Sequence, residues 1–181
     1  HLQRKWLWWR LPPPPLTELR FADIIEDSPK CVKWNTPEQT AQLLSMMSPL
    51  NLAKVEGVKR AGNIMVGTIY KRTRLDEQGI KVQRAEVRFD DIAGCLRTPA
   101  GGSSRQLILI VEGDSVRSRL ISARETARLM GLPDSYMLPD SYNEAYHLTG
   151  DGVVVPVVQH LAANLFAPFL ESLRFNALTA A

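Results

Sequence analysis

The stretch RLISARETARLMGLPDSY (residues 119–136) predicts a short, sharply bounded helix. Ser122 is a favourable N-cap, and Glu125 three residues later completes a capping box, in which each side chain satisfies a backbone N–H at the helix start. Gly131 suits the left-handed position just past a helix, and the proline two residues later prevents continuation. We therefore expect a helix over residues 123–130. Such caps occur in proteins of every function, so the stretch alone does not indicate an activity.

The composition describes a folded chain without a metal site. Its 181 residues are 45% hydrophobic and 23% charged, which suits one domain or two small subdomains. Cys31, Cys95 and three scattered histidines show no metal-ligand spacing, so we expect two free thiols and no metal. The opening residues do not form a secretory signal, and we expect a cytoplasmic protein.

Positive charge is concentrated in the middle third of the chain. Residues 54–105 carry eleven Lys and Arg against six Asp and Glu, a net charge of +5, whereas the other residues together carry −2. A surface that faces phosphates has this distribution, although a solvated basic face also produces it.

The two ends of the chain are rich in apolar residues. Tryptophans at positions 6, 8 and 9 are expected to pack either on this chain's own core or on another protein part. The run Pro12 to Pro15 predicts a polyproline II connector, or else a ligand for a partner. Gly152 to Leu170 is apolar but contains two prolines and several polar residues, so we expect a buried helix and no contact with a membrane.

Local patterns predict a mixed α+β chain. Propensity and turn residues favour a helical turn at 16–25, a helix at 37–47, a hairpin of strands 64–70 and 82–89 around a turn at 76–79, a strand at 106–111, and a final helix from about 153.

Four pieces in a fixed order carry a resemblance to a known family. They are RAEVRFDDIAGCLRTPAGGSSRQ (84–106), SARETARLMGLPDSY (122–136), EAYHLTGDGVVVPVVQHLA (144–162) and the Trp- and Pro-rich beginning of the chain. Together they resemble the C-terminal part of DNA cytosine-5 methyltransferases. The first resembles the end of the family's target-recognition region, the second its ninth motif, and residues 150–158 its tenth.

The resemblance implies an architecture and an activity. Residues 1–115, with their Trp- and Pro-rich opening, would form a small, irregular, strand-rich DNA-recognition domain. Residues 116–181 would supply C-terminal helices that complete an α/β S-adenosylmethionine-dependent methyltransferase domain. The family transfers a methyl group from S-adenosylmethionine to C5 of a flipped-out cytosine, often within restriction-modification systems.

The family's motifs assign roles to five residues of this chain. In the family, the ninth-motif helix anchors the DNA-reading domain to the catalytic domain, and Arg124 and Glu125 match the anchoring positions. The loop that opens the tenth motif borders the cofactor, so the resemblance places cofactor binding at Asp151, Gly152 and Val153. Asp151 stands where the family usually has Asn, and an ionised carboxylate cannot donate a hydrogen bond.

The catalytic parts of the family are missing from this sequence. The family's reactive cysteine follows a proline, whereas Cys31 follows a lysine and Cys95 a glycine. The Glu-Asn-Val sequence and the glycine-rich cofactor loop are absent as well. We therefore expect no catalytic residue in this chain, and we expect its partners to be double-stranded DNA and an N-terminal catalytic part or separate catalytic chain that binds most of the cofactor.

Two stretches, 81–88 and 96–105, are candidates for loops that contact DNA. Arg and Gln read base edges, whereas hydroxyls, cations and backbone N–H groups bind phosphates. The expected base-reading residues are Gln83, Arg84, Arg88 and Arg97. The expected backbone-binding residues are Gly101, Gly102, Ser103, Ser104 and Arg105. Each arginine could instead be solvated or paired with Glu86, Asp90 or Asp91.

Two other functions remain open. The chain could be a stand-alone DNA-binding module, which would bind DNA specifically unaided, whereas a methyltransferase part would form a stable complex with a catalytic chain. A helix-turn-helix over residues 40–62, with Lys54, Lys59 and Arg60, has only helical spacing and positive charge in its favour.

Overall fold

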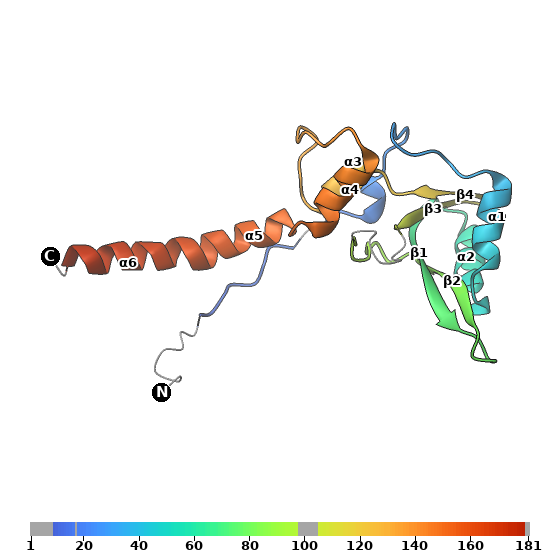
Figure 1. Cartoon of the computed structure of the whole chain (residues 1–181), viewed down its shortest axis with the longest axis horizontal. Coiled ribbons are helices and arrows are strands. Elements are labelled where there is room, and N and C mark those ends of the chain that lie inside the picture. Colours follow the sequence, from blue (N-terminus) through green and yellow to red (C-terminus); the bar gives the residue numbers. More distant parts are fainter. Residues whose placement is uncertain (1–8, 17, 98–104, 180–181) are drawn as a thin grey trace. The chain divides into compact units, whose positions relative to one another are not determined.

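The computed structural model describes residues 9–16, 18–97 and 105–179, which fall into two compact units (Figure 1). The larger unit, Leu19–Gly152, is a four-stranded antiparallel sheet with helices on both faces. The smaller unit contains the two ends of the chain, His1–Glu18 and Val153–Ala181. The predicted α+β class is confirmed. The predicted functional division at residue 115 is not tested by these units and stays a prediction.

The sheet has the strand order β2-β1-β3-β4. Its strands are β1 (Met65–Leu75), β2 (Lys81–Arg88), β3 (Leu107–Glu112) and β4 (Ser115–Leu120). The predicted hairpin is confirmed, and its first strand runs on to Leu75. Asp76 sets the turn, because its Oδ1 accepts the backbone N–H groups of Gln78 and Ile80 at 2.9 and 2.8 Å. β3 was predicted and β4 was not.

Two helices cover one face of the sheet, α1 (Pro37–Ser45) and α2 (Pro49–Ala61). Thr36 and Gln39 form a capping box at the start of α1. Alternate residues of three strands point at these helices. The buried core between them contains Leu43, Met47, Val55, Val58, Ile69, Ala85, Val87, Leu107, Leu109 and Val111. α2 also covers the edge strand β2, since Asn51 Oδ1 accepts from Val87 N at 3.1 Å.

The other face carries η2 (Phe21–Ile24), α3 (Ala123–Leu129) and α4 (Tyr142–Asp151). The second core contains Phe21, Ile24, Leu96, Ile108, Ile121, Met130 and Tyr146. The helix predicted over 123–130 is confirmed as α3, with the capping box of Ser122 and Glu125 present. α4 was not predicted. It begins at Ser141, whose hydroxyl accepts from Glu144 N at 3.5 Å.

In the smaller unit, α5 (Val155–Leu161), η3 (Ala162–Phe166) and α6 (Ala167–Thr179) follow one another. Trp9 and Pro12 contact these helices. Trp9 Nε1 donates to the Asn164 carbonyl at 2.8 Å, and His160 Nε2 lies 3.1 Å from the Pro12 carbonyl oxygen. This contact places one of the three opening tryptophans on the chain itself.

The expectation of a buried helix over residues 152–170 is wrong, since none of the residues of α5 and η3 is buried. An apolar pattern indicates that side chains favour burial. It does not indicate that other residues of the same chain bury them. By length and composition, the helical stretch Tyr142–Leu173 is also apolar enough to cross a membrane, which is weak evidence when it stands alone.

Candidate nucleic-acid interface

A two-stranded ribbon extends beyond the rest of the sheet (Figure 1). β3 pairs with β1 only as far as Ile69, so residues 70–75 of β1 pair with β2 alone. Because side chains alternate along a strand, one face of this ribbon carries Tyr70, Arg72, Arg74, Arg84 and Glu86. A two-stranded β-ribbon is one of the elements that fit the major groove of B-DNA.

A cavity of about 440 Å³ lies where the ribbon meets residues 94–97. We call it the basic hollow. Its lining has four cationic side chains and one carboxylate, so it favours anions and hydrogen-bond acceptors. The lining residues are Tyr70, Lys71, Arg72, Thr73, Gln83, Glu86, Arg88, Gly94, Cys95 and Arg97.

The basic hollow brings together three of the four predicted base-reading residues, Gln83, Arg88 and Arg97. The fourth, Arg84, lies outside it in a shallow depression near Asp76. With the described residues, neither Arg84 nor Arg97 makes a hydrogen bond or an ion pair. Sequence reasoning did not select Tyr70, Lys71, Arg72 or Thr73 as site residues. The signal that could have found them is the continuation of the strand pattern beyond Tyr70 as far as Arg74.

Arg88 is engaged within the chain. Its Nη2 lies 2.5 Å from Asp90 Oδ2, and its Nε donates to both carboxylate oxygens at 3.1 Å. These hydrogen bonds hold the pKa of the Asp90 carboxyl below its usual range. For each arginine, an ion pair was the expected alternative to base reading. At Arg88 this ion pair is present.

The predicted phosphate-binding residues are placed in part. Gly101, Gly102, Ser103 and Ser104 lie outside the described residues. Arg105 lies against α4, because its Nη2 donates to Asn143 Oδ1 and its guanidinium is 5.4 Å from the centroid of the Tyr142 ring.

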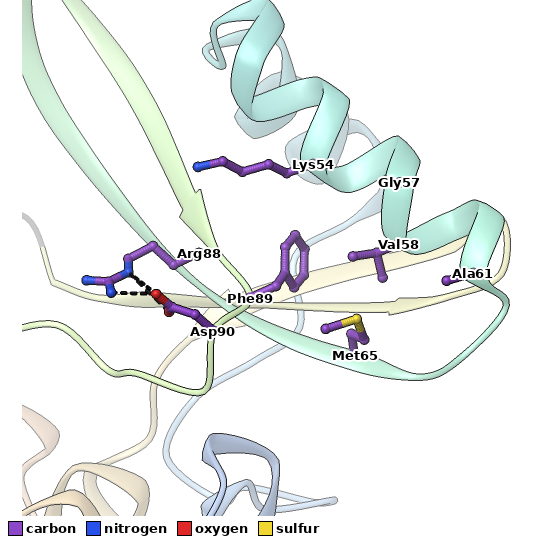
Figure 2. Close-up of a pocket in the computed structure, with 8 residues that line it drawn as sticks. All are labelled: Lys54, Gly57, Val58, Ala61, Met65, Arg88, Phe89 and Asp90. Carbon is purple, nitrogen blue, oxygen red and sulfur yellow. Dashed lines mark hydrogen bonds and ion pairs between the residues drawn. The ribbon is translucent and has the colours of Figure 1, made fainter.

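A second cavity, of about 450 Å³, separates α2 from the end of β2 (Figure 2). Val58, Ala61 and Met65 make it apolar at one end, and Phe89 lies between them and the charged residues. Lys54 at the other end donates to the Val87 carbonyl at 3.2 Å.

The helices α1 and α2 occupy the region of the helix-turn-helix hypothesis. Two of its three cations are engaged within the chain, Lys54 with the Val87 carbonyl and Lys59 with Glu56 Oε1 at 2.8 Å. Of the three cations in this hypothesis, only Arg60 makes no hydrogen bond or ion pair with the described residues.

One of the two predicted anchoring residues, Glu125, holds α3 in place, and the anchoring of a DNA-reading domain to a catalytic domain stays a prediction. Glu125 is fully buried and receives Arg119 Nη2 at 2.6 Å and Nη1 at 2.8 Å. Its two oxygens also accept the backbone N–H groups of Glu26 and Ser122, each at 2.7 Å. Glu125 thus joins α3 to β4 and to the segment before α1. No sequence signal identified Arg119 as its partner.

Arg124 has a different role from Glu125. It points to the loop after α3 and donates to the carbonyls of Pro133 at 3.3 Å and Tyr136 at 2.8 Å. Arg128 holds the same loop, because it donates to both oxygens of Asp134 at 2.7 and 2.8 Å. The two arginines therefore fix the conformation that follows the helix.

The predicted cofactor residues follow one another at the end of α4, and all three are exposed. A Cβ on Gly152 would lie 2.9 Å from the Leu148 carbonyl oxygen, so the backbone there accepts only glycine without a shift. The carbonyl end of α4 offers acceptors, which suit hydroxyl and ammonium groups. The role of these residues at an S-adenosylmethionine site stays a prediction.

A basic ribbon beside a cationic hollow is the kind of surface that nucleic-acid-binding proteins present. Residues 11–167 match the family model of C-5 cytosine-specific DNA methylases, and the chain belongs to this family.

Three relatives illustrate the match. The chain is 43% identical over 49 residues to the type II methyltransferase M.HhaI of Haemophilus parahaemolyticus, 27% of this chain and 15% of that protein. It is 37% identical over 59 residues to the type II methyltransferase M.NlaX of Neisseria lactamica, 33% of this chain and 19% of that protein. It is 31% identical over 85 residues to the DNA (cytosine-5)-methyltransferase CMT2 of rice (Oryza sativa subsp. japonica), 47% of this chain and 6% of that protein. Each alignment thus spans less than a fifth of the relative.

Proposed function

We propose that this chain is the target-recognition and C-terminal part of a DNA cytosine-5 methyltransferase. The family match over residues 11–167 carries the proposal. The basic hollow and the ribbon support the recognition role, because they gather cations and hydrogen-bonding side chains on one surface of the larger unit. Restriction-modification is the proposed setting, since several relatives are type II methyltransferases.

In the proposed reaction the chain reads DNA and does not supply the nucleophile. Enzymes that modify a base extrude it from the stack while they hold the flanking duplex. The ribbon would enter the major groove, where Arg97 and Gln83 donate to base edges and the segment 101–105 binds phosphates. The catalytic part would supply the cysteine thiolate that attacks C6 of the cytosine.

The cofactor and the catalytic part are the remaining proposed partners. S-adenosylmethionine supplies the methyl group, and Asp151, Gly152 and Val153 would border it. The apolar side chains along the C-terminal helices support a protein partner, because surfaces of this kind mark interaction sites. Among them, Val157, Val158, Phe166 and Leu170 are 51, 47, 55 and 55% exposed.

The recognition role is tested in the native polypeptide that contains these 181 residues. Methylation of a library of duplex sites would be compared for wild type, Arg97→Ala and Arg60→Ala. Arg60 is an exposed arginine of α2 and is the matched control. We expect Arg97→Ala to relax the choice of site at one base position by about 1–3 kcal/mol and Arg60→Ala to leave it intact. An unchanged site preference in Arg97→Ala would remove that residue from the interface.

The division of labour is tested with residues 1–181 alone. We expect no incorporation of labelled methyl groups into DNA, because a thiolate, an acid and a cofactor site must be held together for this chemistry. Detectable incorporation would contradict the proposal. Specific DNA binding by this chain without any catalytic partner would favour the stand-alone binding module instead.

A further inference from the structure

The cations around the basic hollow differ in how far they are neutralised. Arg74 uses Nε and Nη2 to bind Glu86 Oε1 at 2.8 and 2.5 Å, and Arg88 is bound by Asp90. Arg72 is held on one side only, since its Nε lies 3.6 Å from Glu86 Oε2. With the described residues, the two terminal nitrogens of Arg72 make no hydrogen bond, and its side chain is 53% exposed.

Tyr70 supports the guanidinium of Arg72. The Cζ atom of Arg72 lies 5.8 Å from the centroid of the Tyr70 ring, within the range of a cation–π contact. The ring restricts Arg72 on one side and Glu86 restricts it through Nε. A long side chain held at two points loses less entropy when it binds, so Arg72 is pre-organised.

Buried groups fix Tyr70 in turn. Its hydroxyl donates to Gln106 Oε1, and burial raises the pKa of Tyr70, which keeps the donor protonated. Gln106 is 1% exposed, and its backbone N–H donates to the Tyr146 hydroxyl at 3.3 Å. Gly94 leaves the space for Tyr70, because a Cβ there would lie 1.9 Å from the tyrosine oxygen.

We propose that Arg72 reads a guanine in the target site, with Tyr70 as its platform and Gln106 as the positioning residue behind it. The inference rests on the proposed function. The two terminal nitrogens of this guanidinium make no hydrogen bond with the described residues and match the O6 and N7 acceptors that guanine presents in the major groove, and the ribbon is an element that fits this groove. Arg74 stands on the same face, but its fork is occupied by Glu86.

The test is selection from a randomised duplex pool by the native polypeptide that contains these residues. Arg72→Ala is compared with Arg74→Ala, which removes the same charge from the same strand face. We expect wild type to select a sequence with a fixed guanine, and Arg72→Ala to lose preference at that one position by about 5- to 150-fold. Arg74→Ala should keep the same preferred sequence. If Arg72→Ala does not fold, Arg72→Lys, which keeps the charge without the planar fork, carries the same test.

The positioning role has its own readout. Gln106→Leu removes the acceptor for Tyr70, so we expect reduced preference at the same guanine and at no other position. Gln106→Glu keeps an acceptor and should recover the preference, whereas a merely structural role would lower affinity for all sequences alike.

The outcomes separate this inference from the proposed function. A selected sequence that is identical for wild type and Arg72→Ala would overturn the role of Arg72 and leave DNA recognition standing. The absence of any selected sequence for wild type would overturn the recognition function, and the inference with it.

Discussion

Replacing Glu125 with alanine should be among the most destabilising substitutions in the larger unit. Glu125 and Arg119 are both fully buried, and the carboxylate accepts two hydrogen bonds from the guanidinium and two from backbone N–H groups. Its removal leaves a buried cation without its counterion, which costs about 3–5 kcal/mol. Because a typical domain is stable by about 5–15 kcal/mol, this loss is a large share of the total.

The assay is urea denaturation of the chain followed by far-UV circular dichroism. Glu56→Ala is the control, because the Glu56 side chain is 57% exposed and its ion pair with Lys59 contributes at most about 0.5 kcal/mol. The double variant Arg119→Met with Glu125→Leu should recover part of the stability, since no orphaned charge remains, although the backbone N–H groups of Glu26 and Ser122 lose their acceptor. A loss below about 1 kcal/mol in Glu125→Ala, or a double variant as unstable as the single one, would refute the reasoning.

Further predictions concern two glycines and one carboxylate. Gly94→Ala should lower the free energy of unfolding by about 1–3 kcal/mol, because its Cβ would collide with Tyr70 at 1.9 Å. A Cβ added at Gly57 in α2 would have nothing within 4 Å, so Gly57→Ala should instead raise the free energy of unfolding by about 0.5–1 kcal/mol. Urea titrations in which Gly94→Ala is more stable than Gly57→Ala would contradict both predictions. The hydrogen bonds from Arg128 hold the pKa of Asp134 below its usual value of 3.8. The stabilisation from this pair is therefore complete above the ordinary pKa and is lost as the pH falls through the lowered one. An NMR titration should give a midpoint below 3.8 that returns to the ordinary value in Arg128→Gln, and equal midpoints would disprove the contact.

Local chemistry made the helix α3 predictable and left β4 unpredicted. Ser122, Glu125 and Gly131 act within a few residues of one another, so the caps could be derived from spacing alone. In β4, Ser118 and Arg119 are buried although both are polar. Their burial depends on partners far away in the sequence, such as Asn35, which donates to Ser118 Oγ at 2.9 Å. Hydrophobic alternation therefore could not indicate the strand.

The candidate site was predictable to a similar extent. Gln83 and Arg97 were expected from residue type and position, and the structure places both at the basic hollow. Arg72 was missed because the strand was expected to end near Tyr70, before the ribbon. The ion pair between Arg88 and Asp90 depends on side-chain geometry. From the sequence, Asp90 was only one of several possible partners for this arginine.

Hydrogen exchange on the native polypeptide, with and without its preferred duplex, tests the central claim most directly. We predict slower exchange of backbone amides in residues 70–75 and 81–88 and in residues 94–97, because these segments form the ribbon and the basic hollow. Protection that falls instead on α2, with the ribbon unchanged, would contradict the assignment of the DNA-reading surface.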